Sequence, residues 1–264
     1  MVDHNTFQKR EDRLLRRVGQ RAVHGLDALF GRHSLVGDEP IFDNDAFPWA
    51  KALESHWRVI RQELDAVLDY RDALPNFQDI ADDVRSITRD DKWKTYFFYG
   101  MGQKAERNCA RCPETTRLVE QVPGMTTAFF SILAPGKHIP AHRGPYKGVL
   151  RYHLGLKVPE PREQCRIRVG DEVRHWEEGV SLIFDDTYDH EVWNDTGGER
   201  AILFLDVLRP LPPRYDLFNK SIIRVFGRTS IVQEGQRKQA LWDARLDAAM
   251  RNGQPVRPEQ PVAP

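Results

Sequence analysis

Hydrophobic residues recur at helical spacing over the first 75 residues of the chain. Across residues 5–31 apolar side chains repeat every three or four positions and arginines occupy much of the rest, which predicts an amphipathic helix. Two interpretations stay open for this helix: packing on the rest of the fold with a solvated charged face, or contact with an anionic membrane surface. A second helix is expected after a loop, with Asp45 as its N-cap and Pro48 in its first turn. Its buried face is expected to contain Leu53, Trp57, Ile60, Leu64 and Val67.

From residue 92 onward the pattern changes to short β-prone runs. Residues 92–99 are aromatic, and residues 100–125 are rich in Gly, Pro and charge, which predicts a connection with a short helix near Glu114 to Val122. Turn residues such as Pro135-Gly136 and Gly197-Gly198 bound the runs that follow. Further strands are expected at 127–133, 149–156, 165–169, 172–176, 180–185, 189–193 and 200–208.

Many short strands at this spacing are typical of a sandwich or a small barrel. We therefore expect a mainly β protein with flanking helices, in which a double-stranded β-helix (a jelly-roll or cupin-like barrel) is covered by N- and C-terminal helices. The C-terminal part begins with a basic and apolar stretch at 217–228 and continues with a helix around Gln236 to Met250. The expected division is a helical N-terminal covering region at 1–75, the barrel domain at 76–212, a C-terminal helical extension at 213–250 and a disordered tail at 251–264.

The charge of the chain is balanced, with 39 Lys and Arg residues against 39 Asp and Glu residues, so no global charge favours a nucleic-acid partner. No apolar run approaches the roughly 18–20 residues that span a bilayer, and the first residues have no apolar signal-peptide core. We therefore expect a cytoplasmic protein, which the membrane interpretation of its first helix would place at the inner face of the membrane. Cys109 and Cys112 have the spacing of half a zinc knuckle, but a turn with incidental thiols is the favoured interpretation.

Two histidines lie beside apolar strand-like runs. His142 is expected in a loop ahead of strand 149–156, and His190 at the start of the run DHEVWN. In a double-stranded β-helix these elements can converge at one mouth of the barrel, where neutral imidazoles are good ligands for Fe(II) or Zn(II). A histidine pair alone is a weak signal.

Four further residues strengthen the signal from the histidine pair. Arg200 precedes the apolar run AILFLDVL. A guanidinium that faces a barrel interior is costly unless an anion pairs with it. A dicarboxylate would do so through a forked charge-assisted contact, whereas the alternative is an arginine that reaches solvent from a strand end. Arg151 and His153 share one face of another strand, and with Ser131 they would add inward-facing donors.

The segments PAHRGPYKGVLRYHLGL, WEEGVSLIFDDTYDHEVWN and ERAILFLDV resemble the aspartyl/asparaginyl β-hydroxylase family. Members of that family are Fe(II)/2-oxoglutarate-dependent dioxygenases, and lipid A acyl-chain hydroxylases are among them. The resemblance implies Fe(II), 2-oxoglutarate as cosubstrate and O2. It places His142 and His190 at the iron-ligand positions, Ser131 and Arg200 at those that hold the distal carboxylate of 2-oxoglutarate, and Arg151 and His153 in the cosubstrate and substrate pocket.

One position departs from the wider oxygenase pattern of two histidines and a carboxylate, because the chain has Gly144 where His-x-Asp would place the aspartate. The peptide hydroxylases of the family resemble this chain in lacking that ligand, which implies that water completes the metal shell, whereas the lipid A hydroxylases keep an aspartate. A missing anionic ligand should weaken the affinity for resting iron. The alternative third ligands near His190 are Asp185, Asp186 and Glu191.

The substrate stays open between two classes. Gly144 favours a peptide Asp or Asn side chain. Phe129 and Val149 stand where the peptide hydroxylases have basic residues, and this apolar change favours a lipid acyl chain, as does the basic stretch 217–228. An interpretation from a different class is a non-catalytic cupin-like module that binds a metal or another ligand. The oligomeric state is not predicted.

Overall fold

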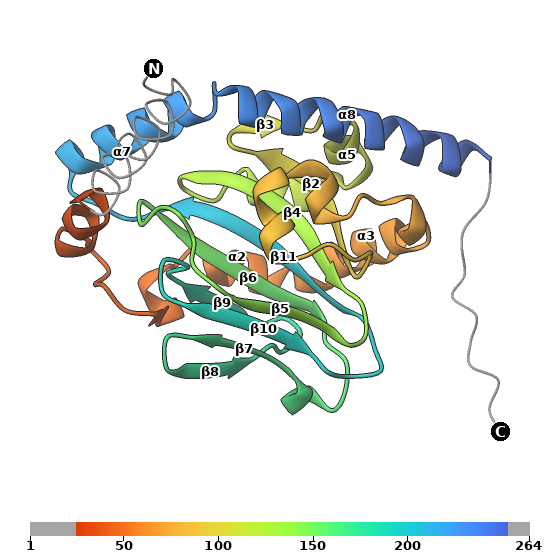
Figure 1. Ribbon diagram of the computed structural model, residues 1–264, viewed down its shortest axis with the longest axis horizontal. Helices are drawn as coiled ribbons and strands as arrows, with labels where there is room; N and C mark the ends of the chain where they lie inside the picture. Colours follow the sequence, from red (N-terminus) through yellow and green to blue (C-terminus); the bar gives the residue numbers. More distant parts are fainter. Residues whose placement is uncertain (1–24, 253–264) are drawn as a thin grey trace, which may run out of the picture.

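Two antiparallel β-sheets enclose the inner core in the computed structural model, which describes residues 25–252 (Figure 1). The larger sheet has the strand order β1-β9-β6-β11-β4-β2-β3, and the smaller sheet has the order β5-β10-β7-β8. From β4 to β11 the chain passes alternately from one sheet to the other, with only β7 and β8 consecutive in one sheet, which is the winding of a double-stranded β-helix. The strands are β1 (Ile41–Phe42), β2 (Trp93–Gly100), β3 (Gln103–Lys104), β4 (Met125–Leu133), β5 (Lys137–His142), β6 (Val149–Lys157), β7 (Cys165–Val169), β8 (Glu172–His175), β9 (Ser181–Phe184), β10 (His190–Asn194) and β11 (Arg200–Leu208).

Helices cover the outer face of the larger sheet, and this leaves its inner face to the space between the sheets. The outer cluster packs α2 (Ala50–Ser55), α3 (Trp57–Leu68), α5 (Glu106–Arg111) and α6 (Pro113–Val119) against sheet residues such as Phe130 and Leu203. The inner cluster joins Phe129 and Phe204 of the larger sheet to Ile167 and Val192 of the smaller one. The shorter helical turns are η1 (Asn44–Ala46), η2 (Arg71–Ala73), α4 (Phe77–Ile80), η3 (Asp82–Ser86) and η4 (Arg162–Gln164).

The strands expected from the sequence are all present, and those at 165–169 and 200–208 match the observed bounds. The strands β1, β3 and β5 and the helices α4 and α5 lie outside the sequence predictions. Because β5 exists, His142 is the last residue of a strand, and its placement in a loop was wrong. Pro140 within β5 argues against a strand in the sequence, but β5 is an edge strand, where a missing N–H is tolerated.

The second predicted helix is in fact two helices that meet at His56. The prediction of Asp45 as the N-cap was wrong, because Asp45 lies inside η1 and its N–H donates to Asp43 at 2.9 Å. α2 begins only after Pro48, at Ala50. The predicted apolar face is nevertheless the buried one, with Leu53, Ile60, Leu64 and Val67 all buried.

The C-terminal part consists of α7 (Pro213–Phe226) and α8 (Ser230–Arg251), and α8 begins earlier than the helix expected around Gln236. α8 packs against α4 and β2, whereas α7 lies at the other end of the molecule (Figure 1). Residues 25–32 are helical, in agreement with the end of the helix expected at 5–31. The rest of that helix, and the expected disordered tail beyond residue 252, lie outside the described residues. Within residues 25–252, no helix combines the length and the apolar character needed to cross a membrane.

Cys109 and Cys112 are buried free thiols in the outer cluster. Burial raises the pKa of Cys112 to about 12, so this thiol stays protonated at neutral pH. In the described part of the chain, no set of three or more His, Cys, Asp or Glu side chains is grouped as a metal site. The two cysteines therefore pack as small apolar side chains.

Candidate active site

His142 and His190 meet at one end of the smaller sheet. They are register partners on β5 and β10, and their ring centroids are 4.0 Å apart. Simple alternation from the buried Ile139 would turn residue 142 outward, but the register shifts by one residue between Ile139 and His142. Such a bulge re-aims the side chains beyond it. The bulge therefore brings the two predicted metal ligands together.

Both imidazoles are held in the tautomer that suits a metal ligand. The Nδ1 of His142 lies 2.8 Å from the carbonyl oxygen of Pro140, and the Nδ1 of His190 lies 3.0 Å from that of Tyr188. Because a carbonyl only accepts, each Nδ1 carries the hydrogen and each Nε2 keeps a lone pair. Burial lowers the pKa of both rings, that of His190 to about 3, so both are neutral at physiological pH.

A carboxylate occupies the space beside Gly144. A Cβ added at residue 144 would collide with the side chain of Asp186, and the Gly144 N–H donates to the Asp186 carbonyl oxygen at 2.6 Å. Asp186 is buried and forms an ion pair with Arg151 at 2.7 Å, and Arg151 also pairs with Asp206 at 3.3 Å. Burial raises the pKa of Asp186 to about 6, against the opposing effect of the Arg151 charge. Position 144 has no carboxylate of its own, but Asp186, from the loop between β9 and β10, places one beside it.

The other two alternative ligands are engaged elsewhere. Asp185 pairs with the buried Arg209 and, at 2.7 Å, with Lys147. Glu191 points to the outer face of the smaller sheet, where it contacts His138 at 2.7 Å and Arg168 at 3.2 Å. Of the three, Asp186 alone lies beside Gly144.

Deeper between the sheets, buried nitrogen donors gather without protein partners. Arg200 is buried with its guanidinium 4.4 Å from the centre of the Trp176 ring, and its Nε and Nη1 have no hydrogen-bond acceptor. The Nε1 of Trp176 and both ring nitrogens of His153 are also unpartnered. Burial lowers the pKa of Arg200 to about 10 and the pKa of His153 well below its usual range. Since buried polar groups are nearly always paired, such a cluster indicates a place for an anionic ligand.

His153 lies between the histidine pair and Arg200. Its pKa responds to the charges of both Arg200 and His190, and its register partner on β11 is Phe204. The centroid of the His153 ring lies 6.0 Å from that of Trp176, which contacts Arg200, and 5.0 Å from that of Phe184, which in turn lies 5.8 Å from that of His190. The predicted face of Arg200, Ile202 and Phe204 is the inner one, because Ile202 and Phe204 belong to the inner cluster.

Ser131 and Arg151 also lie on the inner face, in different surroundings. The hydroxyl of Ser131 accepts a hydrogen bond from Trp93 Nε1 at 3.0 Å. Thr95 is its register partner on β2, and the buried Thr95 hydroxyl has no partner. Arg151 lies with its ion-pair partner Asp186 near His142 and His190. The six predicted residues therefore occupy two ends of this inner face: His142, His190 and Arg151 lie at the end that we call the mouth, Ser131 and Arg200 lie at the other end, and His153 lies between them.

Four residues that face this space were not among the predicted site residues: Trp93, Thr95, Trp176 and Asp206. Asp206 lies on β11, where period-two alternation from Arg200 assigns it to the same face, so this signal was present in the sequence. Trp176 follows the end of β8 and reaches Arg200 only through the fold. Trp93 and Thr95 belong to an aromatic run that carries no sign of polar contacts.

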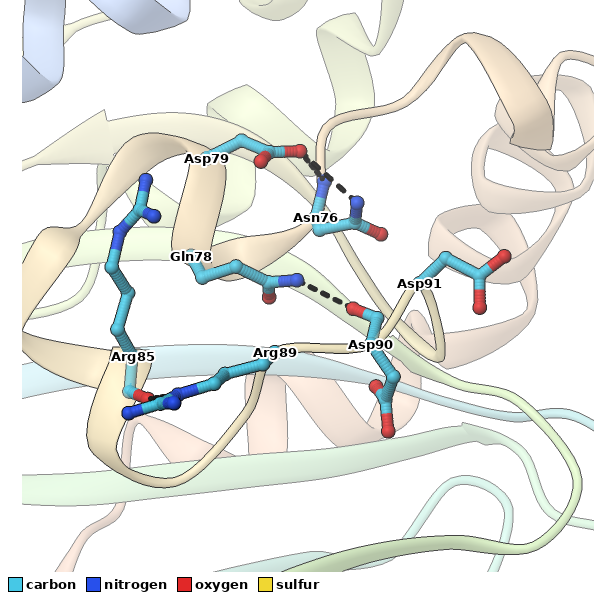
Figure 2. Close-up of a pocket in the computed structure, with 7 residues that line it drawn as sticks. All are labelled: Asn76, Gln78, Asp79, Arg85, Arg89, Asp90 and Asp91. Atoms are coloured by element: carbon cyan, nitrogen blue, oxygen red, sulfur yellow. Dashed lines mark hydrogen bonds between the residues drawn. The ribbon is translucent and has the colours of Figure 1, made fainter.

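A separate hollow of about 500 Å³ lies in the segment at residues 76–91 (Figure 2). Asp79 accepts from the backbone and side-chain nitrogens of Asn76 at 3.0 and 3.1 Å, and Gln78 donates to the Asp90 carbonyl oxygen. None of the predicted site residues lines this hollow. The segment matters to the site through Phe77, whose ring packs on the inner cluster.

Comparison with known proteins decides the family. The model of the family described as aspartyl/asparaginyl β-hydroxylase matches residues 54–210, more than half of the chain. The chain belongs to this family. An ornithine lipid ester-linked acyl 2-hydroxylase from Rhizobium tropici is 46% identical over 86% of this chain and 82% of its own length. The human aspartyl/asparaginyl β-hydroxylase is 37% identical over 61% of this chain but only 21% of its own length.

Solved structures with related folds are more distant than these hydroxylases. A Pseudomonas putida prolyl-4-hydroxylase matches with a TM-score of 0.38 at 18% identity, over 59% of this chain and 88% of its own. A cupin domain of an XRE family transcriptional regulator from Enterobacter cloacae matches with a TM-score of 0.31 at 14% identity, over 44% of this chain and 96% of its own. The family membership of the chain, as a hydroxylase, rests on the sequence matches.

Proposed function

We propose that this hydroxylase uses Fe(II) and 2-oxoglutarate, and that its substrate is an acyl chain of a lipid. The observation that carries the first part is the presence of two features on the inner faces of the two sheets: two neutral imidazoles with free Nε2 lone pairs, and a cluster of buried, unpartnered donors around Arg200. The first suits a divalent metal, and the second suits a carboxylate.

The residues present fit both groups. His142 and His190 would hold the iron through Nε2, while the Nδ1 hydrogen bonds to backbone carbonyls keep the rings oriented. Arg200 would hold the distal carboxylate of 2-oxoglutarate, with Ser131 and His153 beside it. When bound, Fe(II) and 2-oxoglutarate supply the oxidising power with which O2 converts a C–H bond to C–OH, with release of succinate and CO2.

Arg151 and Asp186 would set the charge that a substrate meets near His142 and His190. Arg151 pairs with both Asp186 and Asp206, so its guanidinium is not free to bind a third carboxylate without breaking an ion pair. This arrangement favours a substrate that brings no carboxylate to Arg151. Because residue 144 is glycine, there is room for the Asp186 side chain, which would supply negative charge near a metal that His142 and His190 would hold as neutral ligands.

The acyl-chain substrate is supported by the similarity and by the inner wall. The Rhizobium tropici relative, an acyl 2-hydroxylase, matches this chain over most of both lengths, whereas the match to the human enzyme covers a small part of that protein. Phe129, buried in the inner cluster, stacks on Phe204 at 4.2 Å and on Phe97 at 4.6 Å. The stacked rings make this part of the inner face apolar, which suits an alkyl chain better than a carboxylate. Hydroxylation of a peptide Asp or Asn side chain is the second candidate, because position 144 is glycine.

The test is succinate formation by purified protein given Fe(II), 2-oxoglutarate and O2, together with mass spectrometry of lipids and peptides for the addition of one oxygen atom. His142→Ala and His190→Ala should abolish succinate formation. The matched control is His138→Ala, because His138 lies on the same strand but stacks on Trp193 at the outer face. It should keep wild-type activity.

The outcomes separate the candidates. Oxygen addition to an acyl chain supports the proposal, and oxygen addition to Asp or Asn residues alone replaces its substrate. If no visible absorption band appears when Fe(II) and 2-oxoglutarate are added anaerobically, and no succinate forms once O2 is admitted, the result favours a non-catalytic cupin-like binding module.

A further inference from the structure

An apolar surface is exposed on α7 and the start of α8. Among the residues that the structure describes, five of the ten exposed large hydrophobic side chains fall within residues 217–231. They are Leu217, Phe218, Val225, Phe226 and Ile231, and we call them the α7 face. Leu217, Val225 and Ile231 are each more than 65% exposed, so no neighbouring element of the described chain covers them. Such a concentration of apolar side chains marks an interaction surface.

Basic side chains flank the α7 face. Arg214, Lys220, Arg224 and Arg228 are all exposed, whereas the one acidic residue of α7, Asp216, is paired with Lys220 at 2.7 Å. At 100° per residue, Arg224 lies within about 20° of Leu217 on the helical wheel, and Arg228 lies in the turn between α7 and α8. A helix with exposed apolar residues bordered by cations matches a surface that is apolar below and anionic above.

The inner side of α7 is hydrogen-bonded to the loop between β5 and β6, which begins beside His142. Asn219, the buried residue of α7, donates to the Gly148 carbonyl oxygen at 2.6 Å and accepts from the Tyr146 hydroxyl at 2.7 Å. Gly148 and Tyr146 belong to the loop between His142, which ends β5, and the start of β6. Phe30 packs on both Tyr146 and Phe218 and completes this contact. The α7 face therefore lies beside the loop that follows a metal-ligand position.

We infer that the α7 face docks on the surface of an anionic lipid bilayer, which presents the mouth of the site to lipid acyl chains. The apolar side chains would enter the boundary between headgroups and acyl chains, and the flanking arginines would contact lipid phosphates. This docking has a purpose only if the proposed function, hydroxylation of a lipid acyl chain, is correct. Vesicle binding can nevertheless be measured without hydroxylation, so an experiment can contradict the docking and the proposed function independently.

The experiment is co-sedimentation of the full chain with vesicles of phosphatidylcholine alone and of phosphatidylcholine with about one third phosphatidylglycerol. Wild-type protein should sediment with the anionic vesicles and much less with the neutral ones. Leu217→Asp should lower the vesicle partition by roughly tenfold or more, because a side chain that enters the membrane boundary is replaced by a charge. Arg224→Gln with Arg228→Gln should lower it about tenfold and weaken its dependence on salt.

The matched control is Leu241→Asp. Leu217 and Leu241 are both helical leucines with 67% exposure, but Leu241 lies on α8 outside the α7 face. The control should bind vesicles as the wild type does, and so should His142→Ala, which removes the proposed chemistry without changing the α7 face. Equal loss in Leu217→Asp and Leu241→Asp, or no loss in Leu217→Asp, overturns the inference.

Two other occupants of the α7 face give different results. If it joins a second copy of the chain, light scattering shows a dimer that Leu217→Asp converts to a monomer while vesicle binding stays low. If residues 1–24 cover it, their removal raises vesicle binding through the newly exposed surface, and the intact chain does not sediment. Either result overturns docking of the intact protein on a bilayer.

Discussion

Replacement of Arg200 by methionine separates a ligand-binding role from a structural one. Arg200 is buried, its Nε and Nη1 lack acceptors, and its main contact is the Trp176 ring. Methionine keeps much of the apolar volume and removes the charge. If the guanidinium exists to bind a carboxylate, the variant should lose 2-oxoglutarate without losing stability.

The expected loss of 2-oxoglutarate affinity follows from the free-energy cost of burying the Arg200 charge without an anionic partner. Burial lowers the pKa of Arg200 from 12.5 to about 10. At about 1.4 kcal/mol for each pKa unit, this corresponds to roughly 3 kcal/mol of unfavourable free energy in the ligand-free protein. A bound carboxylate removes that cost, so Arg200→Met should weaken 2-oxoglutarate binding by about 3 kcal/mol, or roughly 100-fold. The free energy of unfolding of the ligand-free variant should be equal to or higher than that of the wild type.

Two measurements check this expectation. Thermal unfolding with increasing 2-oxoglutarate, under anaerobic conditions with Fe(II), gives the affinity through the ligand-dependent rise in Tm. Urea unfolding without ligand gives the stability. The matched control is Arg209→Met, because Arg209 is equally buried but donates to the Lys147 carbonyl oxygen at 2.7 Å and pairs with Asp185. That variant removes one of the two cations that pair with the buried Asp185 and leaves the Lys147 carbonyl oxygen without its donor, and it should lose about 3–5 kcal/mol of stability.

Two results would refute the reasoning. A wild-type affinity for 2-oxoglutarate in Arg200→Met would show that another residue holds the cosubstrate. A loss of stability as large as that of Arg209→Met would show that Arg200 is a structural residue whose charge the fold requires.

Two further changes test local packing. Gly144→Ala should destabilise the protein by about 1–3 kcal/mol, because its Cβ would collide with the Asp186 carboxylate. In a double-mutant cycle with Asp186→Gly, which has its own cost through the lost Arg151 ion pair, the double variant should lose less stability in urea unfolding than the sum of the two single variants. Strictly additive losses would contradict the collision. Asn194→Leu should cost about 2–3 kcal/mol, because the buried Asn194 amide donates to the carbonyl oxygens of Leu133, Ala134 and Gly198. Hydrogen exchange should then increase at the β10–β11 turn, and unchanged exchange there would locate the effect elsewhere.

Period-two alternation and turn residues were sufficient to predict most of the barrel, because each strand has one face in a core. Arg200 could be assigned to the inner face in this way, since β11 is regular and its neighbours are strongly apolar. The helical covering was predicted for the same reason, from apolar spacing that matches the buried faces. Helix ends were less accurate, as at Asp45, because capping depends on local backbone geometry.

What the sequence by itself determined about this protein is its family, its double-stranded β-helix and the residues that face inward on regular strands. Only the tertiary structure decided that His142 turns toward His190, since a bulge in β5 reverses the side-chain alternation there. It also decided that Asp186 fills the space beside Gly144 and that Trp176 covers Arg200. These contacts join residues from different sheets and loops, and no local pattern records which distant side chains the closed barrel brings together.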